Sequence, residues 1–113
     1  MNIVTLDNAL TSVGLGWRGL VSIAYQALPE GARVLQVKEK FGGLRIYTDT
    51  ELIEYRDVLN KLEHISFSLC EYCGQVGHST VLPSGWIKTV CANHYSVKVA
   101  EYEERMEKLS KLV

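Results

Sequence analysis

Two short pairs of potential metal ligands constrain this chain more than any other feature of its sequence. Cys70 and Cys73 form the first pair, Cys91 and His94 form the second, and seventeen residues lie between the pairs. Two intervening residues allow a tight turn to aim both side chains of a pair at one ion. Three thiolates and one imidazole make a common closed tetrahedral site, so we predict one structural Zn²⁺ held by these four residues.

Other interpretations of these residues remain open. The chain has three cysteines, all within the two pairs, and an odd number argues against a disulfide framework. Buried thiols without a metal are the plain alternative, because cysteine is often buried. An iron–sulfur cluster usually takes four thiolates, so the histidine favours zinc. His78 could replace His94 as a ligand, although His94 has the better spacing.

A closed set of four ligands argues against catalysis by the metal, because a catalytic zinc keeps one open position. The chain lacks the His-x-Glu and Pro-Cys-x-x-Cys signature of zinc deaminases. It also has no Gly-x-Ser-x-Gly sequence and no phosphate-binding loop. We therefore predict no catalytic residues and a protein that is not an enzyme.

Length and composition fit one soluble domain. The chain has 113 residues, of which 47% are hydrophobic and 22% charged. Its formal net charge of −1 excludes a global basic field that would attract nucleic acid. No signal-peptide pattern is visible, and no apolar run approaches the roughly 20 residues of a membrane helix. We expect a cytoplasmic protein, without membrane association, whose single domain spans residues 1–113.

Apolar residues at helical spacing predict the helices. A short helix is expected within residues 1–16, and a second over 17–28, closed by Pro29-Glu30-Gly31. The segment from Thr48 to Glu51 has capping-box spacing, which predicts a helix from about Thr48 towards Cys70. The last helix is expected over residues 93–112.

The remaining segments predict strands. Residues 34–47 alternate around two glycines and predict a β-hairpin, and short strands are expected over 80–82 and 86–90 within a zinc-binding segment at 70–94. The fold class is therefore α+β. We predict a small single domain with a β-hairpin packed on helices, a zinc-ribbon-like Cys3His site and a long C-terminal helix.

A two-residue turn at Gly42-Gly43 would place Lys40 opposite Arg45 in the hairpin. Alternation then predicts two faces. The core face would hold Leu35, Val37, Phe41, Leu44 and Ile46, with Glu39 as an exception that we expect to pair with Arg18 or Arg56. The outer face would hold Gln36, Lys38, Lys40, Arg45 and Tyr47.

The outer face of the hairpin predicts a partner-binding patch. Lys38, Lys40 and Arg45 lie beside Tyr47, and such a patch suits a phosphate backbone or an acidic protein surface. The two cations placed opposite each other would repel unless an anion compensates. The alternative is an ordinary solvated strand face.

The last helix carries a heptad pattern of apolar residues. The pattern consists of Tyr95, Val99, Tyr102, Met106, Leu109 and Val113. We expect its first half to pack on the domain's own core. Met106, Leu109 and Val113 are then expected to contact a second chain, either a copy in a homodimer or another protein. Alternatively, the whole pattern packs along the protein's own helices.

A wider set of residues resembles a group of small uncharacterised proteins of bacteria and their phages. The set spans residues 16–94 and consists of Gly16-Trp17, the run Gln36-Val37-Lys38-Glu39-Lys40-Phe41-Gly42-Gly43-Leu44-Arg45 with Tyr47, Cys70, Cys73-Gly74, Gly85-Trp86, Thr89, Cys91 and His94. The resemblance implies the zinc-stapled fold. It also implies that the chain could be a phage-encoded inhibitor or accessory of a host complex.

Three functions from different classes follow from the sequence. The first is a non-enzymatic, zinc-stapled module that binds and regulates another protein, which the long heptad helix favours. The second is a nucleic-acid-binding zinc-ribbon module that uses the basic hairpin face. The third is an enzyme whose site has no recognisable motif, for which a pocket with convergent polar groups would be the sign.

Overall fold

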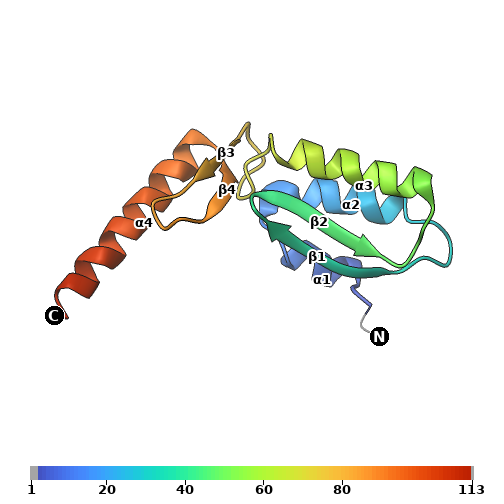
Figure 1. Cartoon of the computed structure of the whole chain (residues 1–113), viewed down its shortest axis with the longest axis horizontal. Helices are drawn as coiled ribbons and strands as arrows, with labels where there is room; N and C mark the ends of the chain where they lie inside the picture. Colours follow the sequence, from blue (N-terminus) through green and yellow to red (C-terminus); the bar gives the residue numbers. More distant parts are fainter. Residues whose placement is uncertain (1–2, 113) are drawn as a thin grey trace.

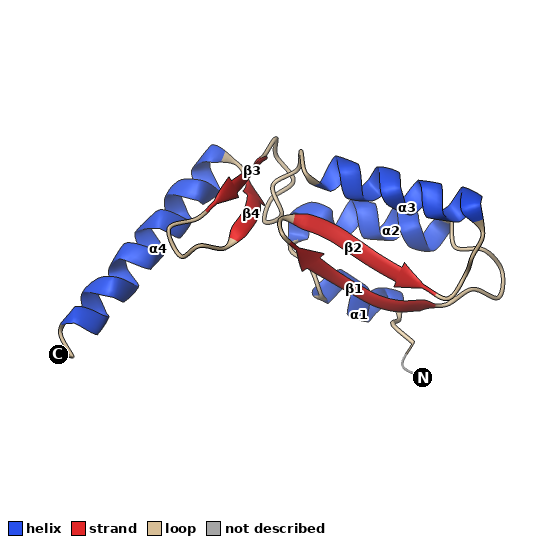
Figure 2. Cartoon of the chain, in the orientation of Figure 1, coloured by secondary structure: helices blue, strands red, loops and turns tan. Residues whose placement is uncertain are grey.

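A computed structural model describes residues 3–112 (Figures 1 and 2). Over this range the elements are α1 (Leu6–Thr11), the 3-10 helix η1 (Leu15–Trp17), α2 (Arg18–Gln26), β1 (Val34–Lys40), β2 (Gly43–Thr48), α3 (Ile53–Ser66), β3 (His78–Val81), β4 (Ile87–Val90) and α4 (Ala92–Ser110). The predicted α+β domain with a hairpin on helices and a long C-terminal helix is confirmed.

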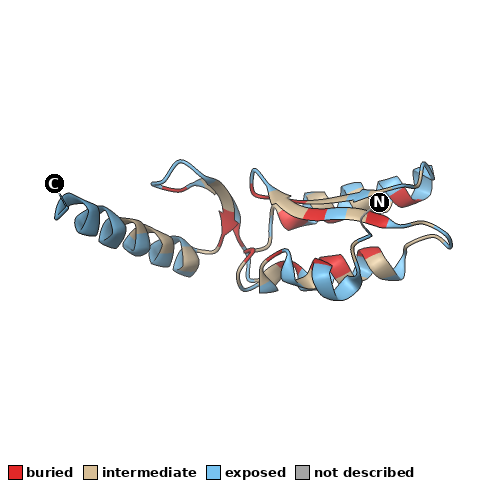
Figure 3. Ribbon diagram, turned by 90° about the horizontal axis from the view of Figure 1, so that it is seen from below, coloured by how far each residue is buried: buried red, intermediate tan, exposed pale blue. Residues whose placement is uncertain are grey.

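The hydrophobic core lies between the β1–β2 hairpin and the first three helices. Figure 3 shows α1 and α2 on one side of this core and the hairpin on the other. The buried members of the core are Ala9, Val13, Trp17, Leu20, Val21, Ala24, Val34, Val37, Leu44 and Leu62. The apolar stripe predicted for the second helix is confirmed, because it supplies Trp17 and the three residues that α2 buries.

The hairpin turn differs from the prediction by one residue on each strand. Phe41 (φ 53°) and Gly42 (φ 83°) form the turn, while Gly43 begins β2 opposite Lys40, and Arg45 pairs with Lys38. The predicted Gly42-Gly43 turn with Lys40 opposite Arg45 is therefore wrong. The cause is tertiary, because a side chain at position 43 would meet the ring of Phe67, which favours glycine at this strand position.

The register of β1 also shifts between Val34 and Gln36, so Val34 is buried in the core and Leu35, which was predicted there, is not part of it. From Gln36 onward the predicted alternation holds. Lys38 and Arg45 still share the outer face, and Tyr47 pairs with Gln36. Phe41 is an error of the core prediction, since at the turn its side chain is 63% exposed. Glu39 pairs with Lys88 of β4, at 2.6 Å, and not with Arg18 or Arg56.

The third helix begins later than predicted. Thr48 is the last residue of β2, and α3 starts at Ile53 after Leu52, whose side chain makes no capping hydrogen bond. Asp49, inside the supposed capping box, instead accepts hydrogen bonds from the backbone and guanidinium of Arg33, at 2.7 and 2.8 Å. These bonds hold the chain extended at the base of the hairpin, so the capping-box prediction is wrong.

The C-terminal helix α4 extends away from the core (Figure 1), and the described chain is 55 Å long in its longest direction. None of its 19 residues is buried. The prediction that Tyr95, Val99 and Tyr102 pack on the core is therefore wrong. The part of the chain that holds the hydrophobic core, residues 4–69, is called the body below. α4 begins at its edge and contacts mainly the β3–β4 hairpin. Val113 lies outside the described residues.

Between residues 3 and 112, no helix combines the length and the apolar character that a membrane span needs.

Candidate metal centre

The four predicted ligands meet at the junction between the body and α4. Cys70 and Cys73 lie in the turn after α3, Cys91 follows β4, and His94 lies in the first turn of α4. Their ligand atoms all lie within 4.8 Å of one another. The Sγ atoms of Cys73 and Cys91 are 3.8 Å apart, and Nδ1 of His94 is 3.6 Å from Sγ of Cys70 and 3.3 Å from Sγ of Cys91.

These distances fit a tetrahedral metal ion. Zinc–sulfur bonds of about 2.3 Å and zinc–nitrogen bonds of about 2.0 Å give tetrahedron edges of roughly 3.8 Å between sulfurs and roughly 3.5 Å between sulfur and nitrogen. As predicted, Cys70, Cys73, Cys91 and His94 lie close enough together to hold one metal ion. His78 starts β3 with an exposed side chain and is not part of the group.

The first pair of ligands lies in a hydrogen-bonded turn. The N–H of Gly74 donates to the carbonyl of Cys70 at 2.8 Å, and the N–H of Cys70 donates to Gln75 at 2.7 Å. Gly74 has a φ of 79°, a conformation that glycine adopts without strain. The turn thereby aims both thiols of the pair to the same side.

The second pair of ligands forms the N-terminus of α4. Cys91 is the N-cap residue, and its Sγ accepts the backbone N–H of His94 at 3.4 Å. This bond is the largest cause that lowers the pKa of Cys91, to about 6. The positive end of the helix dipole also favours a thiolate, which is the form that binds metals.

A segment before α2 supports the first pair from the side of the body. The N–H of Gly16 donates to the carbonyl of Glu71 at 2.8 Å, and Nε1 of Trp17 donates to Leu69 at 3.0 Å. A Cβ on Gly16 would overlap the carbonyl oxygen of Cys70. The close approach therefore requires glycine, and it joins the metal-binding turn to the core through Trp17.

A second connection runs through a half-buried lysine that sequence reasoning missed. Nζ of Lys88 lies 2.6 Å from Glu39 and 3.6 Å from Glu71, so one cation serves β1 and the metal-binding turn. Burial raises the pKa of Glu71, while Lys88 opposes this effect. Burial lowers the pKa of Lys88, but the two carboxylates outweigh it and the net shift is upward. One signal in the sequence could have pointed to Lys88: Glu39 is a lone acidic residue on the core face of β1 and therefore needs a cationic partner.

Four of the residues predicted to bind a partner lie on the outer face of the hairpin, namely Lys38, Lys40, Arg45 and Tyr47, whereas Met106 and Leu109 lie on α4. Nζ of Lys38 lies 5.6 Å from the ring centre of Tyr47, and Nζ of Lys40 lies 5.7 Å from that of Phe41. Among the ion pairs of residues 3–112, neither lysine takes part in one, whereas Arg45 pairs with Glu63 at 3.6 Å. The free positive charge of this face therefore lies on β1.

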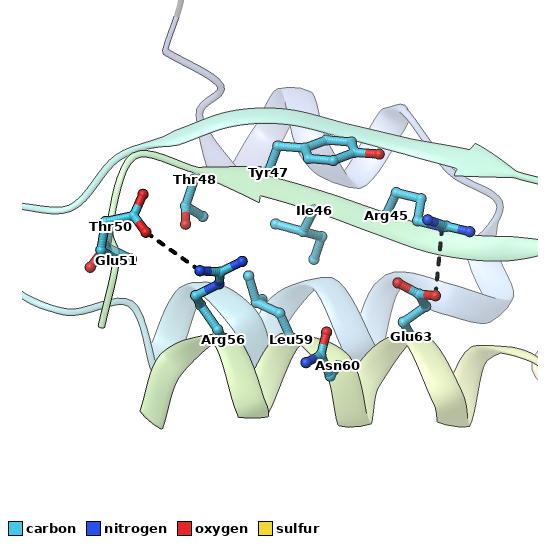
Figure 4. A pocket seen from close by; sticks show the side chains of 10 residues that line it. All are labelled: Arg45, Ile46, Tyr47, Thr48, Thr50, Glu51, Arg56, Leu59, Asn60 and Glu63. Carbon is cyan, nitrogen blue, oxygen red and sulfur yellow. Dashed lines mark hydrogen bonds and ion pairs between the residues drawn. The ribbon is translucent and has the colours of Figure 1, made fainter. Parts of the chain in front are cut away.

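A cleft of about 260 Å³ separates β2 from α3 (Figure 4). Arg45 and Glu63 pair at one end, and Arg56 pairs with Glu51 at the other, at 3.4 Å. Tyr47 points away from α3. Because the two arginines are matched by two carboxylates, the cleft offers no excess charge to a ligand.

Comparisons with known proteins complete the description of the site. No protein-family model matches the sequence, and neither the curated proteins nor the solved structures yield a match to the chain.

Proposed function

We propose that this protein is a non-enzymatic interaction module, stapled by one structural zinc, that binds and regulates another protein through α4. The donor set supports zinc, because three sulfurs and one imidazole at tetrahedral distances are typical of this metal. Four protein donors fill its coordination shell, which suits a structural role. The metal then fixes where α4 starts and in which direction it leaves the body.

The observation that carries this proposal is the exposure of α4. A helix of 19 residues that buries none of them gains little from tertiary packing. It nevertheless presents a row of apolar side chains, with Met106 38% and Leu109 47% exposed beyond the reach of the β3–β4 hairpin. Apolar residues that repeat every three and four positions are the pattern by which a helix packs on another helix or in a groove.

The charged residues of α4 are consistent with such packing. Glu104 pairs with Lys108 at 3.3 Å and Glu107 with Lys111 at 3.5 Å, and these pairs lie off the apolar row. They stabilise the helix slightly and leave the row free. The partner expected here is a helix or an apolar groove of another protein, or a second copy of this chain.

Two double variants test the proposal on the zinc-loaded full chain. Met106→Glu with Leu109→Glu places two charges on the apolar row, whereas Val97→Glu with Ala100→Glu adds the same charges to the opposite face. Light scattering should give a dimer for the unmodified protein and the control variant, and a monomer for the row variant, if the partner is a second copy. If all three are monomers, cross-linking in a lysate of the source organism should capture one protein that only the row variant loses.

Two results would contradict the proposed role of α4. One is equal self-association or equal capture by all three proteins. The other is an unmodified protein that remains monomeric and captures nothing. Circular dichroism should confirm that both variants keep the helix, because all four substituted positions are unburied.

A further inference from the structure

Two hairpin tips meet and form an aromatic groove. Phe41 belongs to the turn of the β1–β2 hairpin, and Trp86 precedes β4 in the other hairpin. Their side chains are 63% and 68% exposed, the values expected of small polar turn residues and not of large aromatic ones. The groove has a volume of about 660 Å³ and is lined by Glu39, Lys40, Phe41, Ser84, Gly85, Trp86 and Ile87.

The backbone of Phe41 is strained. Its φ of 53° lies in the left-handed region, which glycine, asparagine or aspartate would occupy at lower energy. The exposed ring contributes nothing to the core, so packing does not compensate for this strain. Strained residues that stability does not explain are concentrated at binding sites. We therefore infer that the exposed ring of Phe41 serves binding.

The surface beside the groove is positively charged. Lys38 and Lys40 alternate along β1, stack near Tyr47 and Phe41 respectively, and belong to no ion pair of the described chain. The only carboxylate of the groove, Glu39, is occupied by Lys88 and by the N–H of Gly42 at 2.8 Å. A local excess of positive charge thus lies on a protein whose net charge is −1.

We propose that Tyr47, Lys38, Lys40, Phe41 and Trp86, called here the aromatic–basic strip, bind single-stranded nucleic acid. Unpaired bases stack on Phe41 and Trp86 in the groove, and the two lysines contact phosphates. Aromatic platforms interleaved with cations bind single strands with little sequence preference. A duplex keeps its bases stacked inside the helix, so it cannot offer them to the groove. Trp86 also lines a small pocket with Tyr102 of α4, so the strip adjoins the first half of the apolar row but does not include Met106 or Leu109.

Fluorescence tests the strip directly, because the two tryptophans have opposite environments. Trp17 is fully buried, whereas Trp86 is exposed, so stacking of a base should quench only Trp86. The probes are single-stranded DNA and RNA of about 12 nucleotides, a typical site length, and a duplex of the same sequence. With the zinc-loaded full chain, single strands should quench the emission and raise the anisotropy of a labelled probe, and the duplex should do neither.

Variants separate stacking from charge. Phe41→Gly should weaken binding on the order of 10-fold, and Trp86→Ala should weaken it by a similar factor. Trp86→Phe keeps an aromatic ring and should weaken binding less. Phe41→Gly should nevertheless melt at or above the temperature of the unmodified protein, because glycine removes the strain. Replacing Lys38 and Lys40 by glutamine should lower the slope of log K against log salt by about 1.4, since each contact to a single strand contributes about 0.7.

The matched control is Lys108→Gln with Lys111→Gln, which removes two charges from the far end of α4. It should change neither the affinity nor the salt slope. Absence of binding to every oligonucleotide at low salt would overturn the proposal and leave the groove to a ligand of another class. Equal binding of duplex and single strand, or normal binding by both Phe41→Gly and Trp86→Ala, would also overturn it.

Discussion

Removal of the metal should unfold one half of this protein and leave the other half folded. The buried core cluster and the residues packed against it all lie between residues 4 and 69. Residues 70–112 add only a few buried side chains, such as Leu82 and Val90, and none of them belongs to that cluster. The β3–β4 hairpin and α4 therefore depend on the metal for their position, whereas the helices and hairpin of the body do not.

The size of the effect follows from the elements involved. α4 has 19 residues against 14 in α3, 9 in α2 and 6 in α1, so about two fifths of the α-helix belongs to the metal-dependent half. Structural zinc contributes on the order of 10 kcal/mol to small modules of this kind, and an isolated helix of about this length is marginal in water. Chelation should therefore reduce the far-ultraviolet helical signal by up to about two fifths.

Hydrogen exchange read by mass spectrometry locates the loss. Metal analysis of the purified protein should find about one zinc per chain. In Cys91→Ser, amide protection should disappear in β3, β4 and α4 and persist in α2 and α3, while the control His78→Ala should keep both metal and protection. Loss of protection throughout the chain would refute the division into two halves. A fully protected protein without metal would refute the metal site itself.

Three further substitutions test contacts that connect the elements. Burial raises the pKa of Tyr55 to about 12, above its unfolded value of about 10, so stability should fall as pH rises from 10 to 12. Tyr55→Phe should cost about 1 kcal/mol at neutral pH, because the hydrogen bond to Ala24 is lost, and should reduce that alkaline decline in denaturant titrations. Gly16→Ala should weaken zinc binding in competition with a chelator, because its Cβ would strike the metal-binding turn, whereas Gly19→Ala has open space and should not. Lys88→Met should destabilise the protein by about 3 kcal/mol in urea, because two poorly exposed carboxylates lose their cation.

The metal site could be predicted because its geometry depends on residues close in the sequence. Cys70 and Cys73 share one turn, and Cys91 and His94 share the first turn of one helix. Short spacing therefore determines most of the coordination, and the two pairs need only be brought together. The core face of α2 was predictable for a similar reason, because helical periodicity acts within the segment.

The errors arose where distant contacts decide the local structure. The hairpin register depends on the fit of Gly43 against Phe67, and the N–H of Leu44 donates to Ser66 at 2.9 Å. Two adjacent glycines offered two possible turns, and only the partner across the chain selects between them. The heptad row of α4 was visible in the sequence, but periodicity does not reveal whether the covering surface belongs to the same chain.

Trp86 and Lys88 were not selected as functional residues for a related reason. Each gains its significance from a neighbour on the other hairpin, Trp86 from Phe41 and Lys88 from Glu39. A lone tryptophan in a turn and a lone lysine in a strand carry no signal by themselves. Such sites can be found only after the two hairpins have been placed together.

β4 connects the metal site with the aromatic–basic strip, and this connection makes a last prediction. Thr89 donates its hydroxyl to the carbonyl of Gly42 at 2.6 Å, and its own carbonyl accepts the N–H of Glu71 in the metal-binding turn. The same strand begins directly after Trp86 and ends directly before Cys91. Loss of the metal should therefore separate the two walls of the groove and abolish strand binding, although no ligand of the metal touches the strip. By linkage, a saturating single-stranded oligonucleotide should reduce the fraction of zinc lost to a chelator at equilibrium in the unmodified protein but not in Trp86→Ala. Zinc release that is unaffected by the oligonucleotide would mean that β4 does not transmit the state of one site to the other.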